Sequence, residues 1–133
     1  MTRGPSNDSP QFVPAVRQAT DLVGLDGLLC DGAYDSEANH RVAREECGVR
    51  CTVIPVNFRG HRPPGGPSGR YRRQMHRRFP RRRYGQRWQG ESVFSRMKRR
   101  LGSTLRARSV AAQERECLLK VLTHNLMLLG AAA

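Results

Sequence analysis

The sequence lacks the features that would place the protein in a membrane or outside the cell. No apolar run approaches the length that crosses a membrane, and the N-terminus has no apolar segment typical of a secretory signal. The four cysteines (Cys30, Cys47, Cys51 and Cys117) show no spacing typical of a disulfide framework. Cys47 and Cys51 with His40 nearby could suggest zinc, but no second ligand pair follows at zinc-finger spacing. We therefore expect a reduced, soluble, cytoplasmic protein with no membrane partner.

Acidic residues are scarce in the second part of the chain. Residues 1–57 contain five Arg and eight Asp or Glu, whereas residues 58–133 contain nineteen Lys or Arg and three Glu. Between Phe58 and Gly90 there are eleven Arg and no acid. Such a block repels itself and attracts polyanions, and Arg can bind phosphate through two parallel hydrogen bonds. The balance favours nucleic acid as the partner. A basic linker without a specific ligand, or compositional drift towards Arg codons, is the alternative.

The first 57 residues are expected to form four regular elements. Ser9 and Ser36 have the character of helix N-caps, and Gly24 and Gly48 have the character of helix stops. The apolar and β-branched patterns predict a helix over 11–23, a strand over 25–30, a helix over 37–47 and a strand over 49–56. This order predicts an α/β fold with a βαβ unit and parallel strands.

The remaining residues are expected to divide into a loop and two helices. Residues 58–83 contain Pro63, Pro64 and Pro67 and no sustained apolar period, so they predict a flexible, disordered Arg-rich loop. Residues 84–129 predict two helices: one from near Arg87 to Leu101 or Leu105, and one over 110–129. The whole chain, 1–133, has room for one domain.

Two acids are candidates for chemistry. Asp31 ends the first predicted strand, where open α/β sheets place functional groups, although an acid in an exposed turn is the simpler explanation for this residue alone. Arg87, Glu91, Ser95 and Lys98 would stack along one side of the predicted helix, about a quarter turn from its apolar stripe. A surface ladder of opposite charges explains that pattern equally well.

The spacing of four residues identifies a family resemblance. Tyr84, Arg87, Glu91 and Lys98 are separated by two, three and six residues, which is the pattern of the YREK signature. This signature resembles that of bacterial insertion-sequence transposases, whose catalytic domain is an RNase H-like DDE domain. The 60 residues from Asp31 to Glu91 leave no room for a large inserted β domain, so the chain is similar to the insertion sequence four/five type, and among these to the short-spacing members related to insertion sequence five.

Two further segments carry the same resemblance. Residues 30–36, CDGAYDS, resemble the second-aspartate motif of these transposases. Residues 124–126, HNL, resemble their closing helix. The resemblance therefore extends over nearly the whole chain.

The resemblance implies a metal site and a DNA interface. Asp31 would be the second catalytic carboxylate and Glu91 the catalytic Glu, and together they would bind Mg²⁺ or Mn²⁺. Such ions favour hard carboxylate oxygens and assist phosphodiester cleavage and strand transfer at transposon ends. Tyr84, Arg87 and Lys98 would contact transposon-end DNA or order the active site.

Arg81, Arg82 and Arg83 belong to the basic block and are expected to add sequence-independent affinity for DNA, including target DNA. The resemblance places such a protein in the bacterial cytoplasm, associated with the nucleoid.

The family's first catalytic Asp lies on an early strand, upstream of the helix predicted over 11–23. Only ten residues precede that helix, and Asp8 lies in a polar lead-in. The expectation is therefore the C-terminal part of a transposase, an incomplete RNase H-like sheet flanked by helices. Such a chain would be inactive alone and would associate with the missing upstream segment or form a homo-oligomer.

The origin of such a chain stays open: a decayed gene, a mis-called start and a frameshift product are all compatible with the sequence. Two other functions also stay open, namely a non-enzymatic nucleic-acid-binding protein and a truncated regulator of the parent transposase. The sequence indicates neither the terminal repeat, nor the target site, nor a hairpin intermediate.

Overall fold

The computed structural model describes residues 9–60 and 62–131, which form two compact units that meet at Arg87 in the sequence. Asp8, named above, lies outside the described residues. The first unit extends to Arg87 and contains the strands; the second begins at Trp88 and is helical.

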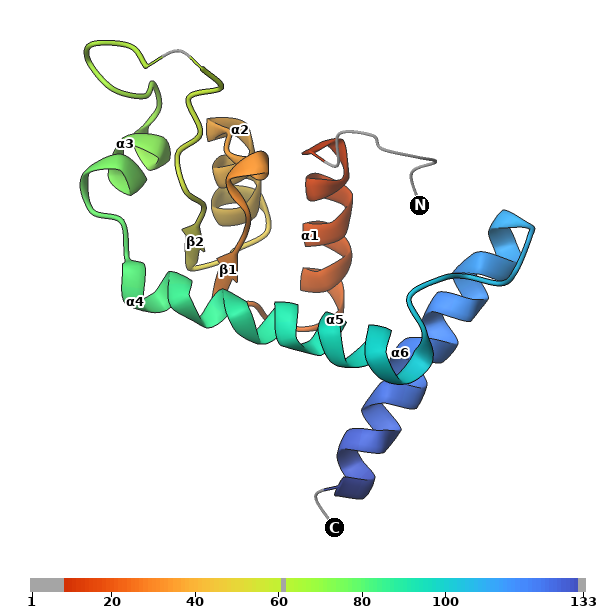
Figure 1. Ribbon diagram of the computed structural model, residues 1–133. Helices are drawn as coiled ribbons and strands as arrows, with labels where there is room; N and C mark the ends of the chain where they lie inside the picture. The colour runs from red at the N-terminus through yellow and green to blue at the C-terminus, as the bar shows by residue number, and fades with distance from the viewer. Residues whose placement is uncertain (1–8, 61, 132–133) are drawn as a thin grey trace. The chain divides into compact units, whose positions relative to one another are not determined.

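Over residues 9–57, the first unit has the order of helices and strands that the sequence predicts (Figure 1). Its elements are η1 (Ser9–Gln11), α1 (Phe12–Leu22), β1 (Gly27–Leu29), η2 (Gly32–Tyr34), α2 (Glu37–Arg41), η3 (Val42–Glu46), β2 (Cys51–Val53), α3 (Arg70–Arg77), α4 (Arg81–Tyr84) and η4 (Gly85–Arg87). β1 and β2 pair in parallel, with Leu28 opposite Thr52. The predicted parallel βαβ unit is confirmed, although both strands are shorter than expected.

A small apolar core holds α1 against the βαβ unit. Phe12 and Val16 lie one helical turn apart and are both 4% exposed, as their spacing predicts. They pack with Ala43, Val49 and Ile54. Burial of these side chains is the main stabilising contribution on this side of the sheet.

The end of α1 differs from the prediction. The helix ends at Leu22, and Val23 adopts an extended conformation that leaves its side chain 59% exposed. The helix predicted over 11–23 therefore ends one residue early, and Val23 is not part of its buried face. Gly24 follows the helix, but the helix stops at the extended Val23 and not through a left-handed glycine.

The helix between the strands begins and ends as the sequence predicts. Ser36 caps α2, because its hydroxyl accepts a hydrogen bond from the backbone N–H of Asn39 at 3.0 Å. The helix continues as η3, a turn of wider π-helix that ends with Gly48 at a φ of 69°. That left-handed conformation is the helix stop expected of Gly48.

Helix α3 corrects the expectation for the basic block. Residues 70–77 were expected to be part of a flexible loop over 58–83, and the structure places a helix there. Tyr71 and Met75, four residues apart, are 8% and 4% exposed, so one face of α3 is buried, and the helix packs against α2 (Figure 1). Two large apolar residues on one helical face are enough to anchor this short helix, although they show no sustained periodicity in the sequence.

Glu37 anchors the start of α3. Its carboxylate accepts hydrogen bonds from the backbone N–H groups of Tyr71 at 3.1 Å and Arg72 at 3.0 Å. Partial burial opposes the charged form, but these backbone hydrogen bonds prevail and lower the pKa of Glu37. Gly69 precedes the helix with a φ of 91°, and a Cβ atom there would collide with the Glu37 carboxylate. The chain can turn into α3 against Glu37 because residue 69 is glycine.

The second unit consists of α5 (Trp88–Leu101) and α6 (Val110–Ala131), close to the two helices predicted for this region. Gly102, with a φ of 82°, follows α5. Glu116 of α6 fixes the connection, because its carboxylate accepts hydrogen bonds from the backbone N–H groups of Arg106 and Ala107, both at 2.9 Å. These bonds lower the pKa of Glu116. Among residues 9–60 and 62–131, no helix is long and apolar enough to cross a membrane.

Candidate functional site

Asp31 lies at the C-terminal end of the β1 segment, where the sequence places it. The Cys30 backbone N–H still bonds to Val53 of β2 at 3.1 Å, and Asp31 is the next residue. Its Oδ1 accepts a hydrogen bond from the backbone N–H of Ala33 at 3.0 Å, which caps η2 and fixes the side chain. Gly32 lies close to the segment that follows β2, since a Cβ atom at residue 32 would lie 3.4 Å from the Pro55 carbonyl oxygen. The residues around Asp31 therefore present its carboxylate at the end of a parallel strand pair.

A guanidinium group holds the other oxygen of Asp31. Arg87 Nη2 lies 3.1 Å from Asp31 Oδ2, and the two side chains are 32% and 55% exposed. The guanidinium carbon also lies 5.9 Å from the centre of the Tyr84 ring, within the range of a cation–π contact. Phe79 supports that ring from its edge, at 5.1 Å between ring centres. Two residues of the four-residue signature, Tyr84 and Arg87, are thus joined to Asp31 by contacts.

Arg87 lies at the boundary between the two units. It belongs to η4, directly before α5 begins at Trp88, so the expectation that it stacks with Glu91, Ser95 and Lys98 along one helix stays a prediction. Glu91, Ser95 and Lys98 do share α5, and they line the same surface hollow of about 490 Å³. Asp31 is in the first unit and Glu91 in the second, so the expectation that their carboxylates face one another across a metal ion stays a prediction.

The thiol beside Asp31 has a strongly perturbed pKa. Burial raises the pKa of Cys30 to about 11; Arg87 opposes this change and the Asp31 carboxylate adds to it. The Cys30 thiol is therefore neutral at physiological pH and unsuited to act as a nucleophile or metal ligand.

Two further acids pair with arginines of the basic block. Asp26, ahead of β1, lies 3.0 Å from Arg83 and 3.1 Å from Arg50. Asp35 lies 2.8 Å from Arg72, and its side chain has no exposed surface. Asp35 is therefore one half of a buried ion pair. The sequence did contain a signal for these pairs, in the opposite charges of its first 57 residues and of the block that follows.

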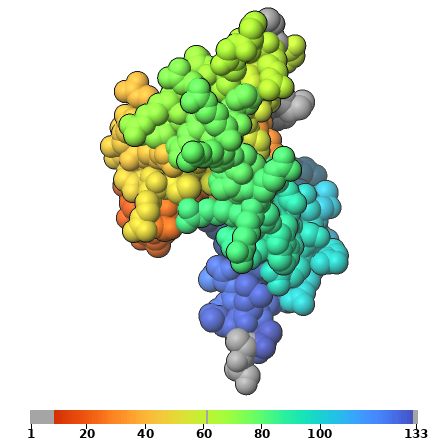
Figure 2. Space-filling model, turned by 90° about the vertical axis from the view of Figure 1, so that its left-hand side faces the viewer, coloured from red at the N-terminus to blue at the C-terminus, as the bar shows by residue number. Residues whose placement is uncertain are grey.

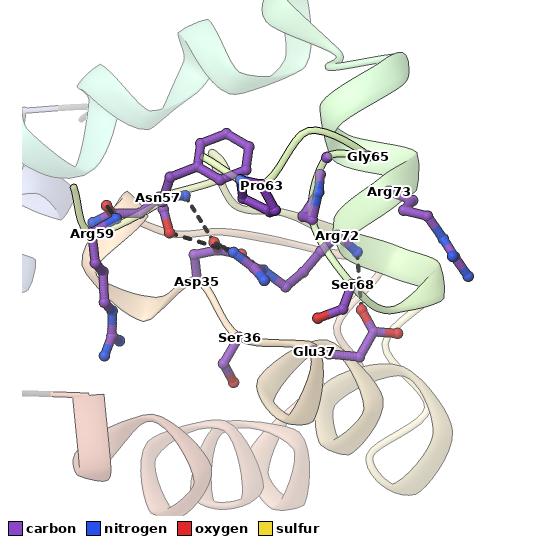
Figure 3. A pocket seen from close by; sticks show the side chains of 13 residues that line it. Asp35, Ser36, Glu37, Asn57, Arg59, Pro63, Gly65, Ser68, Arg72 and Arg73 are labelled. Atoms are coloured by element: carbon purple, nitrogen blue, oxygen red, sulfur yellow. Dashed lines mark hydrogen bonds and ion pairs between the residues drawn. The ribbon is translucent and has the colours of Figure 1, made fainter. Parts of the chain in front are cut away.

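A pocket of about 790 Å³ lies beside the buried ion pair, and Figure 3 shows Arg72 reaching across to Asp35 and Asn57. Arg59 and Ser68 also contribute to its lining. Neither Asp31 nor any residue of α5 lines this pocket. The Asp35–Glu37 segment and the start of α3, which are attached to each other, form part of its wall.

The arginines of the basic block divide into two groups. Arg72, Arg83 and Arg87 bind carboxylates within the first unit. Arg81 and Arg82, on α4, are exposed. Figure 2 shows residues 62–87, in yellow-green to green, at the molecular surface beside the orange and yellow residues of the βαβ unit. The exposed arginines are therefore available to bind a large anion.

Metal binding requires more ligands than Asp31 provides. In the part of the chain that the structure describes, no group of three or more His, Cys, Asp or Glu side chains could hold a metal ion. The Asp31 carboxylate is a hard oxygen donor of the kind that divalent cations favour, and its side chain is 55% exposed.

The family model for the transposase DDE domain matches residues 1–126 of the chain. The chain belongs to this transposase family. No curated protein and no solved structure matches it. Membership of the family indicates a nuclease-type enzyme of DNA transposition, in a family that generally uses divalent metal ions, with DNA as the partner. The mixed helix and strand architecture with its short parallel sheet is consistent with part of such a domain.

Proposed function

We propose that the chain serves transposition of the insertion sequence four/five type with the YREK signature, in an RNase H-like domain. Asp31 and Glu91 are two carboxylates of its metal site. The observation that carries this proposal is the contact between Arg87 and Asp31 at 3.1 Å, supported by the Tyr84 ring. It joins the signature to the aspartate motif, two parts of the sequence 56 residues apart. A chance match of spacing would give no reason for these residues to meet.

The proposed metal is Mg²⁺ or Mn²⁺, held by Asp31 and Glu91. When bound, such an ion activates a water or 3′-hydroxyl and stabilises the leaving oxygen of a phosphodiester. Two carboxylates offer fewer oxygen ligands than two such ions need. We therefore propose that a third carboxylate, from another segment of polypeptide, completes the site, and that this chain alone does not cleave DNA.

The DNA interface is proposed to have two parts. Arg81 and Arg82 are exposed on α4 and bind phosphates of any sequence. Tyr84, Arg87 and Lys98 contact the ends of the element or order the active site. DNA binding without catalysis remains the second candidate function, and the observation that favours it is the exposure of arginines on α3 and α4.

The test is a cleavage assay on labelled duplexes that carry the element's own ends, with Mg²⁺ or Mn²⁺. The chain alone is expected to leave the duplex intact, and the chain supplied with a polypeptide that carries the third carboxylate is expected to cleave it. Asp31→Asn and Glu91→Gln should each abolish that cleavage, whereas Arg41→Gln should retain it, because the contact of Arg41 with Glu45 is exposed. Retained cleavage in Asp31→Asn would contradict the catalytic assignment. Cleavage by the purified chain alone, with contaminating nucleases excluded, would contradict the need for a third carboxylate.

A further inference from the structure

The pocket of about 790 Å³ in the first unit has no role in the function proposed above (Figure 3). Its wall is formed by the Asp35–Glu37 segment, by residues that follow β2 and by the start of α3. A pocket of this volume fits a ligand of many atoms better than a single small ion. The charges and surfaces of the wall indicate which kind of ligand fits.

The two acids in the wall have partners within the protein. Asp35 is paired with Arg72 at 2.8 Å and has no exposed surface. Glu37 accepts the backbone N–H groups of Tyr71 and Arg72, so the N-terminus of α3 is already occupied by a carboxylate. An anion in the pocket would therefore be bound by side chains and not by the end of the helix.

Two other arginines in the wall have no carboxylate partner. Arg59, after β2, and Arg73, on α3, are both exposed and both line the pocket. Among residues 9–60 and 62–131, no carboxylate lies within ion-pair distance of either guanidinium group. Figure 3 shows Arg59 and Arg73 at opposite ends of the pocket, with Asp35 and Arg72 between them. The pocket therefore offers two separate positive groups to a ligand with more than one negative group.

The backbone fixes the positions of both arginines. Asn57 Oδ1 accepts the backbone N–H of Arg59 at 2.9 Å, and Arg59 adopts a left-handed conformation with a φ of 48°. That conformation is uncommon for a residue with a side chain, and such residues gather at functional sites. Arg73 is fixed through α3, which the Asp35–Arg72 pair attaches to the rest of the unit. Little backbone ordering is therefore needed when a ligand binds.

Part of the wall between the arginines is apolar. Phe58 and Pro63 line the pocket, and the guanidinium carbon of Arg62 lies 5.5 Å from the centre of the Phe58 ring. The exposed Ser68 hydroxyl adds a hydrogen-bond donor. Positive groups beside an aromatic ring are the combination with which proteins bind a nucleic-acid strand, since the former contact phosphates and the latter contacts a sugar or base.

We propose that this pocket binds a segment of one DNA strand, with phosphates at Arg59 and Arg73 and the sugar and base against Phe58. An unpaired strand and one strand of a duplex carry this same phosphodiester chemistry. The inference adds a site to the proposed function and rests on it for the identity of the nucleic acid. The pocket is separate from the contacts proposed for Arg81 and Arg82, which do not line it.

The experiment compares two double variants of the full chain that remove the same charge from the basic block. The pocket variant is Arg59→Gln with Arg73→Gln. The control variant is Arg77→Gln with Arg78→Gln, which removes two exposed arginines that do not line the pocket. Binding of a fluorescent DNA strand, alone or annealed to its complement, is measured by anisotropy at several salt concentrations.

The pocket variant should bind the strand about tenfold more weakly or worse, because two charge-assisted contacts are lost. Its slope of log K against log salt should be shallower by about 1.4 for a single strand or by about 1.8 for a duplex. The control variant should lose less than about threefold, through the general positive charge alone. If only one of the two DNA forms shows the difference, that form is the one that occupies the pocket.

A second measurement locates the strand. In the ¹⁵N-labelled chain, DNA should shift the amide signals of Gly65, Gly66 and Ser68, which line the pocket. These shifts should persist in the control variant and be lost in the pocket variant. Inorganic phosphate at the same phosphate concentration should not reproduce them. The same spectra report folding, and Arg59→Lys with Arg73→Lys replaces the pocket variant should that be unfolded; it should lose part of the affinity, because Lys lacks the planar fork.

Three outcomes would overturn the inference. Equal losses of affinity in the two variants would show that the pocket arginines act only as general positive charge. Unchanged amide signals around the pocket would place the strand elsewhere on the protein. Equal shifts with inorganic phosphate would make the pocket a site for small anions. The proposed interface at Arg81 and Arg82 would survive each of these results, whereas absence of DNA binding by the wild type would remove both that interface and the pocket site.

Discussion

Arg72 holds the Asp35 carboxylate with two nitrogens: Nε lies 3.0 Å from both oxygens, and Nη2 lies 2.8 Å from Oδ2. The Asp35 side chain has no exposed surface, and its Oδ2 also accepts the backbone N–H of Asn57 at 2.8 Å. A carboxylate in this position is stable only while its partners are present, because an isolated buried charge is costly. The pair therefore attaches α3 to the turn that follows Asp31.

Removal of one member of this pair should destabilise the protein. We expect Arg72→Ala to lower the free energy of unfolding by about 3–5 kcal/mol, since it leaves the Asp35 carboxylate buried and uncompensated. Arg17→Ala is the matched control, because the Arg17–Glu46 pair is more than half exposed on both sides, and it should cost less than about 1 kcal/mol. Urea unfolding followed by circular dichroism measures both. Similar losses for the two variants would contradict the expectation that breaking the buried Asp35–Arg72 pair costs more stability than breaking an exposed pair.

Stability should fall as the pH is lowered from about 7 to about 5. Burial lowers the pKa of His40 below its ordinary value of 6.5; Asp35 and Glu37 oppose this change, whereas Arg44 and Arg72 add to it. A lowered folded-state pKa means that the unfolded chain takes up the proton first. The contribution of neutral His40 is therefore complete above pH 6.5 and is lost as the pH falls below it.

The measurement is thermal or urea unfolding at a series of pH values, for the wild type and for His40→Gln. The variant should be less stable at pH 7, because the His40 ring is fully buried and its Nδ1 lies 2.7 Å from Thr52 Oγ1. Its stability should nevertheless change less between pH 7 and pH 5. An unchanged pH dependence in His40→Gln would assign the effect to other groups.

Cys30 should react slowly with alkylating agents. With a pKa of about 11, only about one thiol in a thousand is ionised at pH 8, against about one in ten for an ordinary cysteine. We expect iodoacetamide to modify Cys30 roughly a hundredfold more slowly than an unperturbed thiol, as measured by mass spectrometry of peptides. Arg87→Gln should slow the reaction further, because Arg87 lowers the pKa of Cys30. Faster modification of Cys30 in this variant would show that the Arg87 charge does not act on the thiol.

Salt titration of DNA binding should separate the arginines by their contacts. Each phosphate neutralised contributes about −0.9 to the slope of log K against log salt for duplex DNA. Replacement of the exposed Arg81 and Arg82 by Ala should flatten that slope with the fold intact. Arg83→Ala should change binding and stability together, because Arg83 is held by Asp26. Equal effects of all three would contradict this division.

The signature residues should behave differently from the exposed arginines. Replacement of Arg87 or Lys98 by Ala should weaken discrimination between the element's ends and a random duplex more than it weakens general affinity. Titrations of the single variants on both duplexes, at several salt concentrations, measure the difference. Identical losses on the two duplexes would mean that these side chains act only as positive charge.

The order of helices and strands over residues 9–57 was predictable because its signals are local. Ser36 and Gly48 mark the ends of a helix through contacts within a few residues, and Phe12 and Val16 reveal a buried face by their spacing. Asp31 was predictable as the residue at a strand end for the same reason. Its chemical importance came from the family resemblance and not from the local pattern.

Helix α3 and the ion pairs were not predictable in this way. Tyr71 and Met75 are too few to create an apolar period among many arginines. The partners Arg72 and Asp35 are 37 residues apart, and charge composition alone does not select which arginine binds which acid. The arginines of the basic block therefore predicted a flexible loop that binds an external anion. In the structure, carboxylates of the first 57 residues neutralise part of that charge.

The attachment of Asp35 to Arg72 also has a consequence for synthesis on the ribosome. Asp35 leaves the exit tunnel before Arg72 does, so its carboxylate must stay hydrated until the later arginine emerges. The strand pair and α2 can therefore close over Asp35 only after residues 70–77 have emerged. A chain that stops after Asn57 would contain both strands and still fail to bury this turn, so the smallest independently folding piece should extend through α3.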